Sequence, residues 1–547
     1  MKKYLALIMA LVLALGLVLT GCGGDKNPQT SNDPKPTASQ SGDGKDVMGG
    51  NSGATSGEGV KGTSDETLRV VLSAEPDGLM PQYTESKASA AVNMCMYDTL
   101  VKWDTATNTY SEWLATAWEW VDETHLRFTL RDDVKFVNGE TMTAEDVLYT
   151  FQVGSKYNNQ TAYTRIFDVD NFVVEDDTHI VMALNAPYPT VLDVLGNDMY
   201  CIVSKAGIEA NGGDEAAARK PLGIGTGKFT FTEWADGRTI TLTRNDNYWR
   251  QDELPYYKQI VFTFVSDAAS RAMNVESKDV DIASEIMATQ VQGLEGNKDL
   301  TVTVFNTSTC RTFWMNCSSG PLANEKVRQA IFLLLDPNAV RTVANGGYGE
   351  LAETNFSRYC SVYAAPGADY VRQVDVARAK ELLAEAGYPD GFTLKFMTVP
   401  TSQLVAEIVQ GCLQEANIKL EISLLEIGTY IGALFQGDYE TYIGSADNWD
   451  VAKMLAQVDG RVPPFSAMGG AQYKDEALEK LIDAAAYEQD DAARKEAYAQ
   501  VQAYVRDHFV NVGLCNETRI ECSRTGLTGL KIDMRGYAQY ADVRPAA

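Results

Sequence analysis

The stretch of sequence that decides the fold runs Arg127-Phe128-Thr129-Leu130-Arg131-Asp132-Asp133-Val134-Lys135-Phe136. Apolar and polar residues alternate from His125 to Leu130, which predicts a strand. After Asn138-Gly139-Glu140, the residues Thr143-Ala144-Glu145-Asp146 open a helix with an N-cap and an acidic first turn. A strand is therefore followed by a helix at this point of the chain.

Strands and helices alternate along much of the chain, which is typical of an α/β arrangement. We expect strands at Leu68–Leu72, Thr301–Val304 and Cys310–Asn316, and helices at Ala88–Leu100 and Asn324–Leu335. Later helices are expected at 376–386, 404–416 and 490–506, and later strands at 393–397 and 419–425.

Other blocks follow the first in a fixed order: Ile224-Gly225-Thr226-Gly227, Asn245 with Tyr248-Trp249, Asp267-Ala268-Ala269, Val280-Asp281-Ile282, Val327-Arg328-Gln329-Ala330, Gly346-Gly347-Tyr348-Gly349 and Ala377-Arg378-Ala379-Lys380-Glu381. Together with Arg127–Phe136, these blocks resemble the signature of bacterial solute-binding protein family 5. That family comprises the extracytoplasmic oligopeptide- and dipeptide-binding components of ABC transporters. The resemblance covers nearly the whole body of the chain.

The resemblance implies an α/β, two-lobed, periplasmic-binding-protein-like fold with an extra subdomain in the first lobe. It implies crossings between the lobes near Cys310–Asn316 and Phe509–Cys515, and two crossing strands form a natural hinge. The division we expect is a lipoprotein signal peptide at 1–21, a tether at 22–64, lobe I at 65–309 with an inserted subdomain at about 98–219, lobe II at 310–508, and a return to lobe I at 509–547.

The N-terminus has the parts of an export signal. Lys2 and Lys3 precede an apolar run from Leu5 to Leu19, and Leu19-Thr20-Gly21-Cys22 resembles a bacterial lipobox. The alternative is a transmembrane anchor, but the run is shorter than the roughly 20 residues that span a bilayer. We therefore expect Cys22 to be acylated, and two acyl chains are enough for stable anchoring.

Residues 23–64 are rich in Gly, Ser, Thr, Asp and Pro and contain hardly any large apolar residue. Such a segment can bury too little apolar surface to compensate for the conformational entropy that it would lose on folding. We therefore expect a flexible tether. It would hold the body off the outer face of the cytoplasmic membrane.

The whole chain has 74 acidic and 47 basic side chains, which gives a net charge of −27. This charge repels phosphate backbones, so no nucleic acid partner is expected. We expect a monomer.

Eight cysteines remain besides Cys22: Cys95, Cys201, Cys310, Cys317, Cys360, Cys412, Cys515 and Cys522. An exported chain could pair them, but a chain of this size does not need disulfides for stability. We favour buried free thiols.

Gly223-Ile224-Gly225-Thr226-Gly227-Lys228-Phe229 looks like a phosphate-binding loop. Leu222 stands where such a loop needs its first glycine, and Phe229 stands where it needs Ser or Thr. We therefore predict a glycine-rich turn between two strands.

The sequence has only three histidines, isolated from one another, and neither an H-E-x-x-H nor a G-x-S-x-G motif. We predict no enzymatic activity, and no catalytic, metal-binding or cofactor-binding residue.

The ligand-binding residues are expected around Gly437–Asp450, where an alternating strand opens into Asp447, Asn448 and Trp449. The resemblance implies that Asp447 pairs with the free α-amino group of a peptide. It also implies that Glu85 contacts the ligand, and we expect Tyr83, Tyr348 and Tyr359 to do so too. No arginine stands just upstream of Asp447, where Thr441 lies. The resemblance therefore supports a contact with the carboxylate of the ligand less well than a contact with its amino group.

These features predict a lipid-anchored protein that captures a di- or oligopeptide and delivers it to an ABC permease. The same frame could instead bind an oligosaccharide, an opine, a nickel chelate or haem. A non-transport receptor or chaperone, or an exported hydrolase, are the remaining alternatives.

Overall fold

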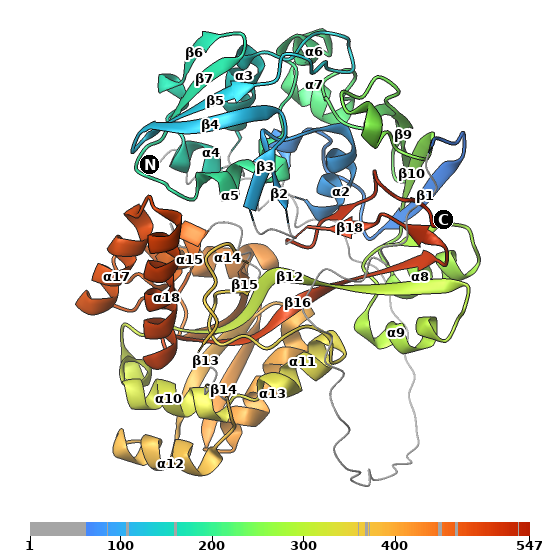
Figure 1. Cartoon of the computed structure of the whole chain (residues 1–547). Coiled ribbons are helices and arrows are strands. Elements are labelled where there is room, and N and C mark those ends of the chain that lie inside the picture. Colours follow the sequence, from blue (N-terminus) through green and yellow to red (C-terminus); the bar gives the residue numbers. More distant parts are fainter. Residues whose placement is uncertain are drawn as a thin grey trace, which may run out of the picture. The chain divides into compact units, whose positions relative to one another are not determined.

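The computed structural model describes residues 62–84, 86–104, 109–157, 161–358, 360–366, 370, 372–446, 451–464, 469–533 and 535–547. Figure 1 shows how their helices and strands are arranged. The chain divides into two units, Met1–Gly50 and Asn51–Ala547, and the second contains every described residue. Cys22, the predicted signal peptide and most of the predicted tether lie outside the described residues. Within the described part, no helix has the length and apolar composition that crossing a bilayer requires.

Ten strands form one mixed sheet, in the order β14-β13-β15-β12-β16-β11-β1-β10-β9-β8. β1 is parallel to β10 and β11, and β13 is parallel to β14 and β15. The bounds are β1 Thr67–Leu72, β8 Phe229–Ala235, β9 Thr239–Arg244, β10 Gln259–Phe264, β11 Ile282–Ala283, β12 Leu300–Met315, β13 Phe392–Thr398, β14 Ile418–Leu424, β15 Thr441–Ala446 and β16 Asn511–Arg524.

Two long strands of this sheet, β12 and β16, join the two lobes. They pair antiparallel from Leu300 opposite Arg524 to Trp314 opposite Asn511. Leu300 packs in a hydrophobic cluster of the first lobe together with α8 and α9, whereas Trp314 packs in the core of the second lobe. Figure 1 shows the two strands side by side along their length. The predicted two-lobed α/β fold with two crossing strands is confirmed.

The prediction of two separate strands at Thr301–Val304 and Cys310–Asn316 was wrong, because β12 is a single strand of 16 residues. Between the two predicted strands, Phe305 and Asn306 pair with Arg519 and Thr518 of β16, and a register shift follows between Asn306 and Cys310. The hydroxyl of Thr307 donates to the carbonyl oxygen of Glu517 at 2.9 Å. Pairing with β16 on both sides of this shift keeps the strand continuous through its polar middle.

The first lobe also contains a small antiparallel sheet in the order β4-β5-β7-β6, with a hydrophobic cluster of its own. The predicted strand is β5 (His125–Leu130), and the predicted capped helix is α3 (Ala144–Gly154), where Thr143 and Asp146 form a capping box. The other bounds are η1 Pro81–Tyr83, α2 Lys87–Met96, β2 Val101–Asp104, β3 Thr109–Glu112, β4 Ala115–Asp122, α4 Thr161–Ile166, η3 Val169–Asn171, β6 Val173–Asp176, β7 His179–Ala183, α5 Val191–Leu195, η4 Asp198–Tyr200, α6 Lys205–Ala210, α7 Asp214–Arg219, η5 Gln251–Glu253, α8 Ala268–Glu276 and α9 Ala288–Glu295. After β16, the chain returns to this lobe as β17 Leu527–Thr528, β18 Lys531–Ile532, β19 Ala538–Gln539 and β20 Arg544–Pro545.

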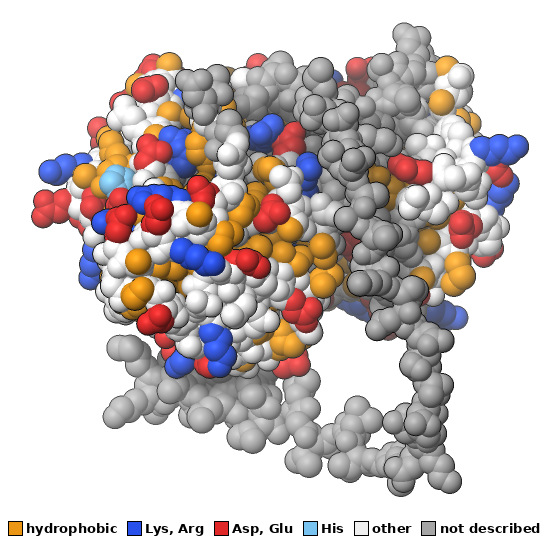
Figure 2. Space-filling view, turned by 90° about the horizontal axis from the view of Figure 1, so that it is seen from below, with side chains coloured by type: hydrophobic (Ala, Val, Ile, Leu, Met, Phe, Trp, Pro, Cys, Tyr) orange, Lys and Arg blue, Asp and Glu red, His pale blue; other side chains and the backbone are white. Residues whose placement is uncertain are grey.

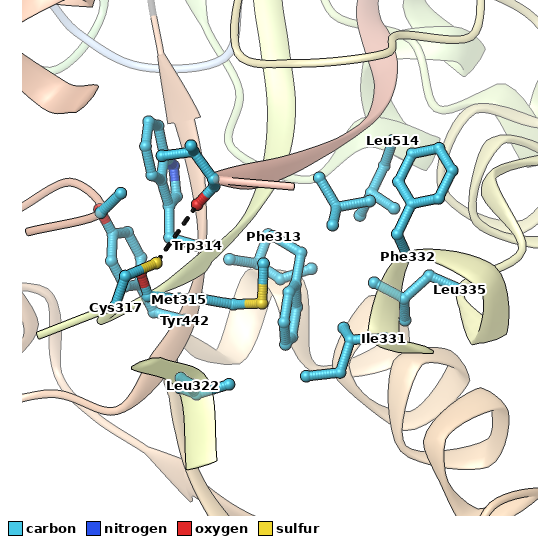
Figure 3. Packing of buried hydrophobic residues seen from close by; sticks show 14 of the residues in the cluster. Phe313, Trp314, Met315, Cys317, Leu322, Ile331, Phe332, Leu335, Tyr442 and Leu514 are labelled. Carbon is cyan, nitrogen blue, oxygen red and sulfur yellow. Dashed lines mark hydrogen bonds between the residues drawn. The ribbon is translucent and has the colours of Figure 1, made fainter. Parts of the chain in front are cut away.

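The second lobe has one continuous hydrophobic core, to which β12 contributes successive side chains. Phe313 stacks on Phe396 of β13, and on the other face of the strand Trp314 stacks on Tyr442 of β15 (Figure 3). The helices are η6 Gly320–Ala323, α10 Glu325–Leu334, α11 Pro337–Asn345, α12 Val376–Glu385, η7 Pro400–Ser402, α13 Gln403–Gln414, α14 Ile427–Gln436, α15 Val451–Val458, α17 Glu476–Tyr487 and α18 Asp491–Asp507. These helices include the ones that the sequence predicts at 324–335, 376–386, 404–416 and 490–506. Along the chain they alternate with the predicted strands.

The glycine-rich stretch at 223–227 lies between helix α7 and strand β8, so it is a structural loop but not the predicted turn between two strands. Its backbone lies directly against the end of α2, where the Gly227 N–H donates to the carbonyl oxygen of Met96 at 2.9 Å. A Cβ built at Gly225 would lie 2.1 Å from that oxygen. The predicted helix at Ala88–Leu100 stops at Met96, since Tyr97 is already extended where this loop crosses it.

All eight cysteines other than Cys22 are free, and seven of them are buried, which confirms the prediction of buried thiols. Burial raises the pKa of Cys95, Cys310, Cys317 and Cys360 to about 12. Acidic and basic side chains are interspersed on the face of the molecule that Figure 2 shows.

Candidate functional site

The register of β15 determines where the predicted ligand-binding segment leaves the sheet. Thr441 to Ala446 pair with Met315 to Cys310 of β12, so the last residue of β15 lies opposite Cys310. Cys310 lies in the part of β12 between the residues packed in the first lobe and those packed in the second. The chain after Ala446 therefore starts where the strand crosses between the lobes. Asp447, Asn448 and Trp449 come next in the sequence and lie outside the described residues.

The other predicted ligand-binding residues lie in separate places. Tyr83 ends η1, and its ring meets the ring of Tyr157 edge-on at 5.0 Å between centroids. Tyr348 packs in the cluster around α9, and burial together with the nearby Glu295 raises its pKa. No described contact joins Tyr83 to Tyr348. Glu85 and Tyr359 lie outside the described residues, so the predicted ligand-binding set remains a prediction.

An ionic cluster lies at the carboxyl ends of the parallel strands β1 and β11, the edge of an α/β sheet at which ligands usually bind. Glu285, just after β11, accepts hydrogen bonds from Ser73, just after β1, and from Arg519 of β16. Arg519 also donates to the fully buried Glu521 at 2.7 Å. Burial alone would raise the pKa of Glu285, but Arg519 and Ser73 outweigh burial and lower it. Glu285 is thus held as a carboxylate.

Glu285 has a φ of 54°, a left-handed conformation that is uncommon for a residue with a side chain. Such strained residues often occur at functional sites. The sequence alone gave no signal for this cluster, because its members come from strands that are more than 200 residues apart in the chain.

A cavity of about 570 Å³ lies in the first lobe and is called the first-lobe cavity here. Its size suits a small-molecule ligand. Its walls come from the end of α2, the β2–β3 hairpin, the α5–η4 segment and the β18–β19 return: Met94, Tyr97, Asp98, Thr99, Lys102, Trp103, Tyr110, Ser111, Trp113, Asp193, Gly196, Asn197, Asp198, Cys201, Lys531, Ile532, Asp533, Arg535 and Gln539.

Asp98 anchors one wall of the first-lobe cavity. It is 8% exposed, and it accepts hydrogen bonds from Trp113 Nε1 at 2.8 Å, Thr226 Oγ1 at 2.9 Å and Trp249 Nε1 at 3.2 Å. An acid between the apolar residues of Tyr97-Asp98-Thr99-Leu100-Val101 must find such donors if it is buried. Asp98 within this apolar run is the one local signal from which this wall of the cavity could have been predicted.

Asp193 connects the wall of the first-lobe cavity to the second lobe. One of its carboxylate oxygens accepts from the Tyr110 hydroxyl at 2.8 Å, and the other accepts from the Ser361 hydroxyl at 2.8 Å. Ser361 lies between Cys360 and Val362, which both pack in the core of the second lobe. The first-lobe cavity therefore adjoins a point at which the lobes touch.

Comparison with known proteins identifies the architecture around these features. A sequence model described as "Bacterial extracellular solute-binding proteins, family 5 Middle" matches residues 109–460, which is more than half of the chain. The chain belongs to family 5. Its members are solute-binding proteins that work with ABC permeases, and the resemblance in the sequence is thereby confirmed.

Curated relatives of this family 5 chain are similar to it over most of their length. A dipeptide-binding protein from Pseudomonas aeruginosa is 25% identical over 495 residues, which cover 84% of this chain and 91% of that protein. The glutathione-binding protein GsiB from Pectobacterium atrosepticum is 24% identical over 425 residues, which cover 74% and 79%.

Solved structures show the same fold. HbpA2 from Haemophilus parasuis has a TM-score of 0.78 at 21% identity, with 88% of this chain and 100% of that chain covered. The ABC transporter-associated periplasmic binding protein DppA from Helicobacter pylori, in complex with the peptide STSA, has a TM-score of 0.71 at 22% identity, with 88% and 98% covered. NikA from Brucella suis in complex with Fe(III)-EDTA has a TM-score of 0.76 at 21% identity, with 88% and 100% covered. The fold of this chain is thus found in one protein that holds a peptide and in another that holds Fe(III)-EDTA.

Proposed function

We propose that this chain is the lipid-anchored, extracytoplasmic substrate-binding component of an ABC importer. It captures di- or oligopeptides between its lobes and delivers them to the permease. The observation that carries the proposal is membership of family 5 together with relatives that are named for binding a dipeptide and glutathione.

The strand register supports the same proposal. β15 ends opposite Cys310, in the part of β12 between the two lobes, and Asp447 is the next residue. A ligand bound between the lobes would lie near this point. A carboxylate there suits a peptide, because a buried ammonium group needs a counter-charge or a strong hydrogen-bond acceptor.

The test measures peptide binding by calorimetry with the full chain and with the variant Asp447→Asn. The variant keeps an acceptor oxygen and removes the charge. If Asp447 pairs with the α-amino group, losing it costs about 2–5 kcal/mol of binding free energy, which is more than a tenfold loss of affinity. An N-acetylated peptide has no ammonium group, so it should bind weakly to the wild type and lose little more on mutation.

Two outcomes would contradict the proposal. Wild-type affinity of Asp447→Asn for the free peptide would remove Asp447 from the site. If no peptide bound while an oligosaccharide, an opine, a nickel chelate or haem did, the ligand class would be wrong and the frame would serve another solute.

Lipid anchoring at Cys22 is a separate part of the proposal, and it rests on the lipobox in the sequence. Cys22→Ser should release the protein from the membrane or leave the signal uncleaved, which fractionation and mass measurement would detect. A processed variant that stayed on the membrane as firmly as the wild type would rule out the anchor. We also propose the division into lobe I at 65–309, lobe II at 310–508 and a return at 509–547.

A further inference from the structure

The first-lobe cavity has an unusual balance of hydrogen-bonding groups in its wall. Its carboxylates already have partners: Asp98 accepts three hydrogen bonds from side chains within 3.2 Å, and Asp193 accepts two at 2.8 Å. Asp198 and Asp533 both form ion pairs with Arg535, at 2.6 Å and 3.0 Å. The acids of the wall are therefore occupied by groups of the protein itself.

Two donors in the same wall are not occupied in this way. Lys102 has its ammonium group 3.9 Å from the centroid of the Trp113 ring, and the described residues offer it no carboxylate within ion-pair distance. Asn197 is 3% exposed, and its amide nitrogen has no hydrogen-bond partner among the described residues. The orientation of this amide is fixed, because its oxygen accepts from Arg535 at 2.6 Å and from the Met199 N–H at 3.1 Å.

Lys102 also lines a second cavity of about 400 Å³, which contains Lys228, Lys531 and Asp542. Both of these lysines pair with Asp542, and Lys228 also pairs with Glu253 at 3.3 Å. Burial lowers the pKa of Lys102, and Lys228 and Lys531 act in the same direction against the opposing effect of Asp542 and Asp98. Burial is the largest of these effects, so the net result is a lowered pKa for Lys102, and an anion bound beside its ammonium group would stabilise the charge.

Aromatic rings complete the wall. Trp103 and Tyr110 lie 4.8 Å apart between ring centroids, and Trp113 lies under Lys102. Rings with a few convergent polar donors are typical of small-molecule sites. Among the described residues of this wall, the carboxylates are already paired and Lys102 is not. The cavity should therefore favour a ligand that supplies a hydrogen-bond acceptor.

We propose that the first-lobe cavity binds a carboxylate group of the peptide ligand, with Lys102 as the counter-charge. This inference rests on the proposed peptide-binding function. Asp193, in the same wall, touches the second lobe through Ser361, so a ligand held between the lobes has the first-lobe cavity beside it. The first-lobe cavity would supply a contact for the carboxylate end of the peptide, because the sequence around Asp447 offers no arginine for this contact.

The experiment compares the affinities of Ala-Ala and Ala-Ala-Ala, each as the free acid and as the C-terminal amide, by calorimetry with the full chain. Wild type should prefer the acid by about tenfold or more, since the amide cannot pair with Lys102. Lys102→Met keeps the apolar stem over Trp113 and should abolish the preference, whereas Lys102→Arg should retain it.

Lys531→Met is the matched control. It removes the same charge from the same two cavities, but its ammonium group is already paired with Asp542 at 3.1 Å, so the preference for the acid should persist. Thermal unfolding of each variant would verify that it folds, and if Lys102→Met does not fold, the comparison of acid and amide binding to the wild type still tests the inference.

The two proposals fail in different ways. If wild type binds the peptides and Lys102→Met keeps the preference for the acid, the inference about the first-lobe cavity is wrong and peptide binding stands. If wild type binds the acids and the amides equally, the inference is wrong as well. If wild type binds none of the peptides in either form, the peptide-binding function itself fails, and the inference fails with it.

Discussion

Arg535 offers a sharp test of how the C-terminal return is held to the first lobe. Its side chain is 6% exposed, and its guanidinium group donates to Asn197 at 2.6 Å and forms ion pairs with Asp198 at 2.6 Å and Asp533 at 3.0 Å. The guanidinium carbon also lies 4.1 Å from the centroid of the Tyr537 ring. Arg535→Met preserves the apolar part of the side chain but leaves two carboxylates, 6% and 17% exposed, without their counter-charge.

Breaking a buried ion pair by removing one partner costs about 3–5 kcal/mol, so Arg535→Met should lower the free energy of unfolding by that amount at pH 7. The measurement is urea unfolding followed by circular dichroism. The control is Arg378→Met, because Arg378 also pairs with two carboxylates, at 2.8 Å and 3.2 Å, but is 45% exposed. The control should lose less than about 1 kcal/mol.

The pH dependence gives a second readout of the same substitution. Burial raises the pKa of Asp533, and Arg535 opposes this effect, so removing Arg535 should raise that pKa further. An acid whose folded-state pKa lies above its unfolded value destabilises the fold at high pH, and protonation relieves this as the pH falls. The difference between variant and wild type should therefore shrink from pH 7 towards pH 5. If Arg535→Met is no less stable than Arg378→Met, the buried network does not hold the return in place.

Two further predictions follow from the buried thiols and from the contact between the lobes. In the native protein a thiol reagent should reach at most Cys412 among the eight free cysteines and should modify the other seven only after unfolding, because those seven are buried; rapid modification of several thiols in the native state would contradict this burial. Ser361→Ala removes a hydrogen bond to the carboxylate of Asp193 that is worth about 1.5–3 kcal/mol. The variant should show a larger radius of gyration in solution scattering and weaker ligand binding, and an unchanged scattering curve with unchanged affinity would mean that this bond does not couple the lobes.

The sequence predicted elements whose pattern is local. β5 and α3 lie where alternation and capping place them, since a strand with one buried face and a helix with a capping box need no distant partner to be recognised. β12 was predicted as two strands, because the strand that continues it through its polar middle, β16, lies about 200 residues later in the chain. Asp98 within an apolar run was a local signal for one wall of the first-lobe cavity, but the cavity as a whole could not be predicted, because Asp98, Asn197 and Arg535 come from three distant segments that only the folded chain brings together.

The blocks that carry the family resemblance largely hold the backbone in place, and this explains why they predict the fold better than the ligand. Arg271, beside Asp267-Ala268-Ala269, donates to the carbonyl oxygens of residues 265, 266, 284 and 285. Arg328 likewise donates to those of residues 322, 323 and 508, and Gly225 lets one segment of backbone lie against another. Such contacts are the same whatever the protein binds. Lys102, by contrast, has no carboxylate partner among the described residues, and its ammonium group lies at the edge of two cavities. A side chain in that position can change without disturbing the frame, so it is at such positions that members of one family can come to bind different solutes.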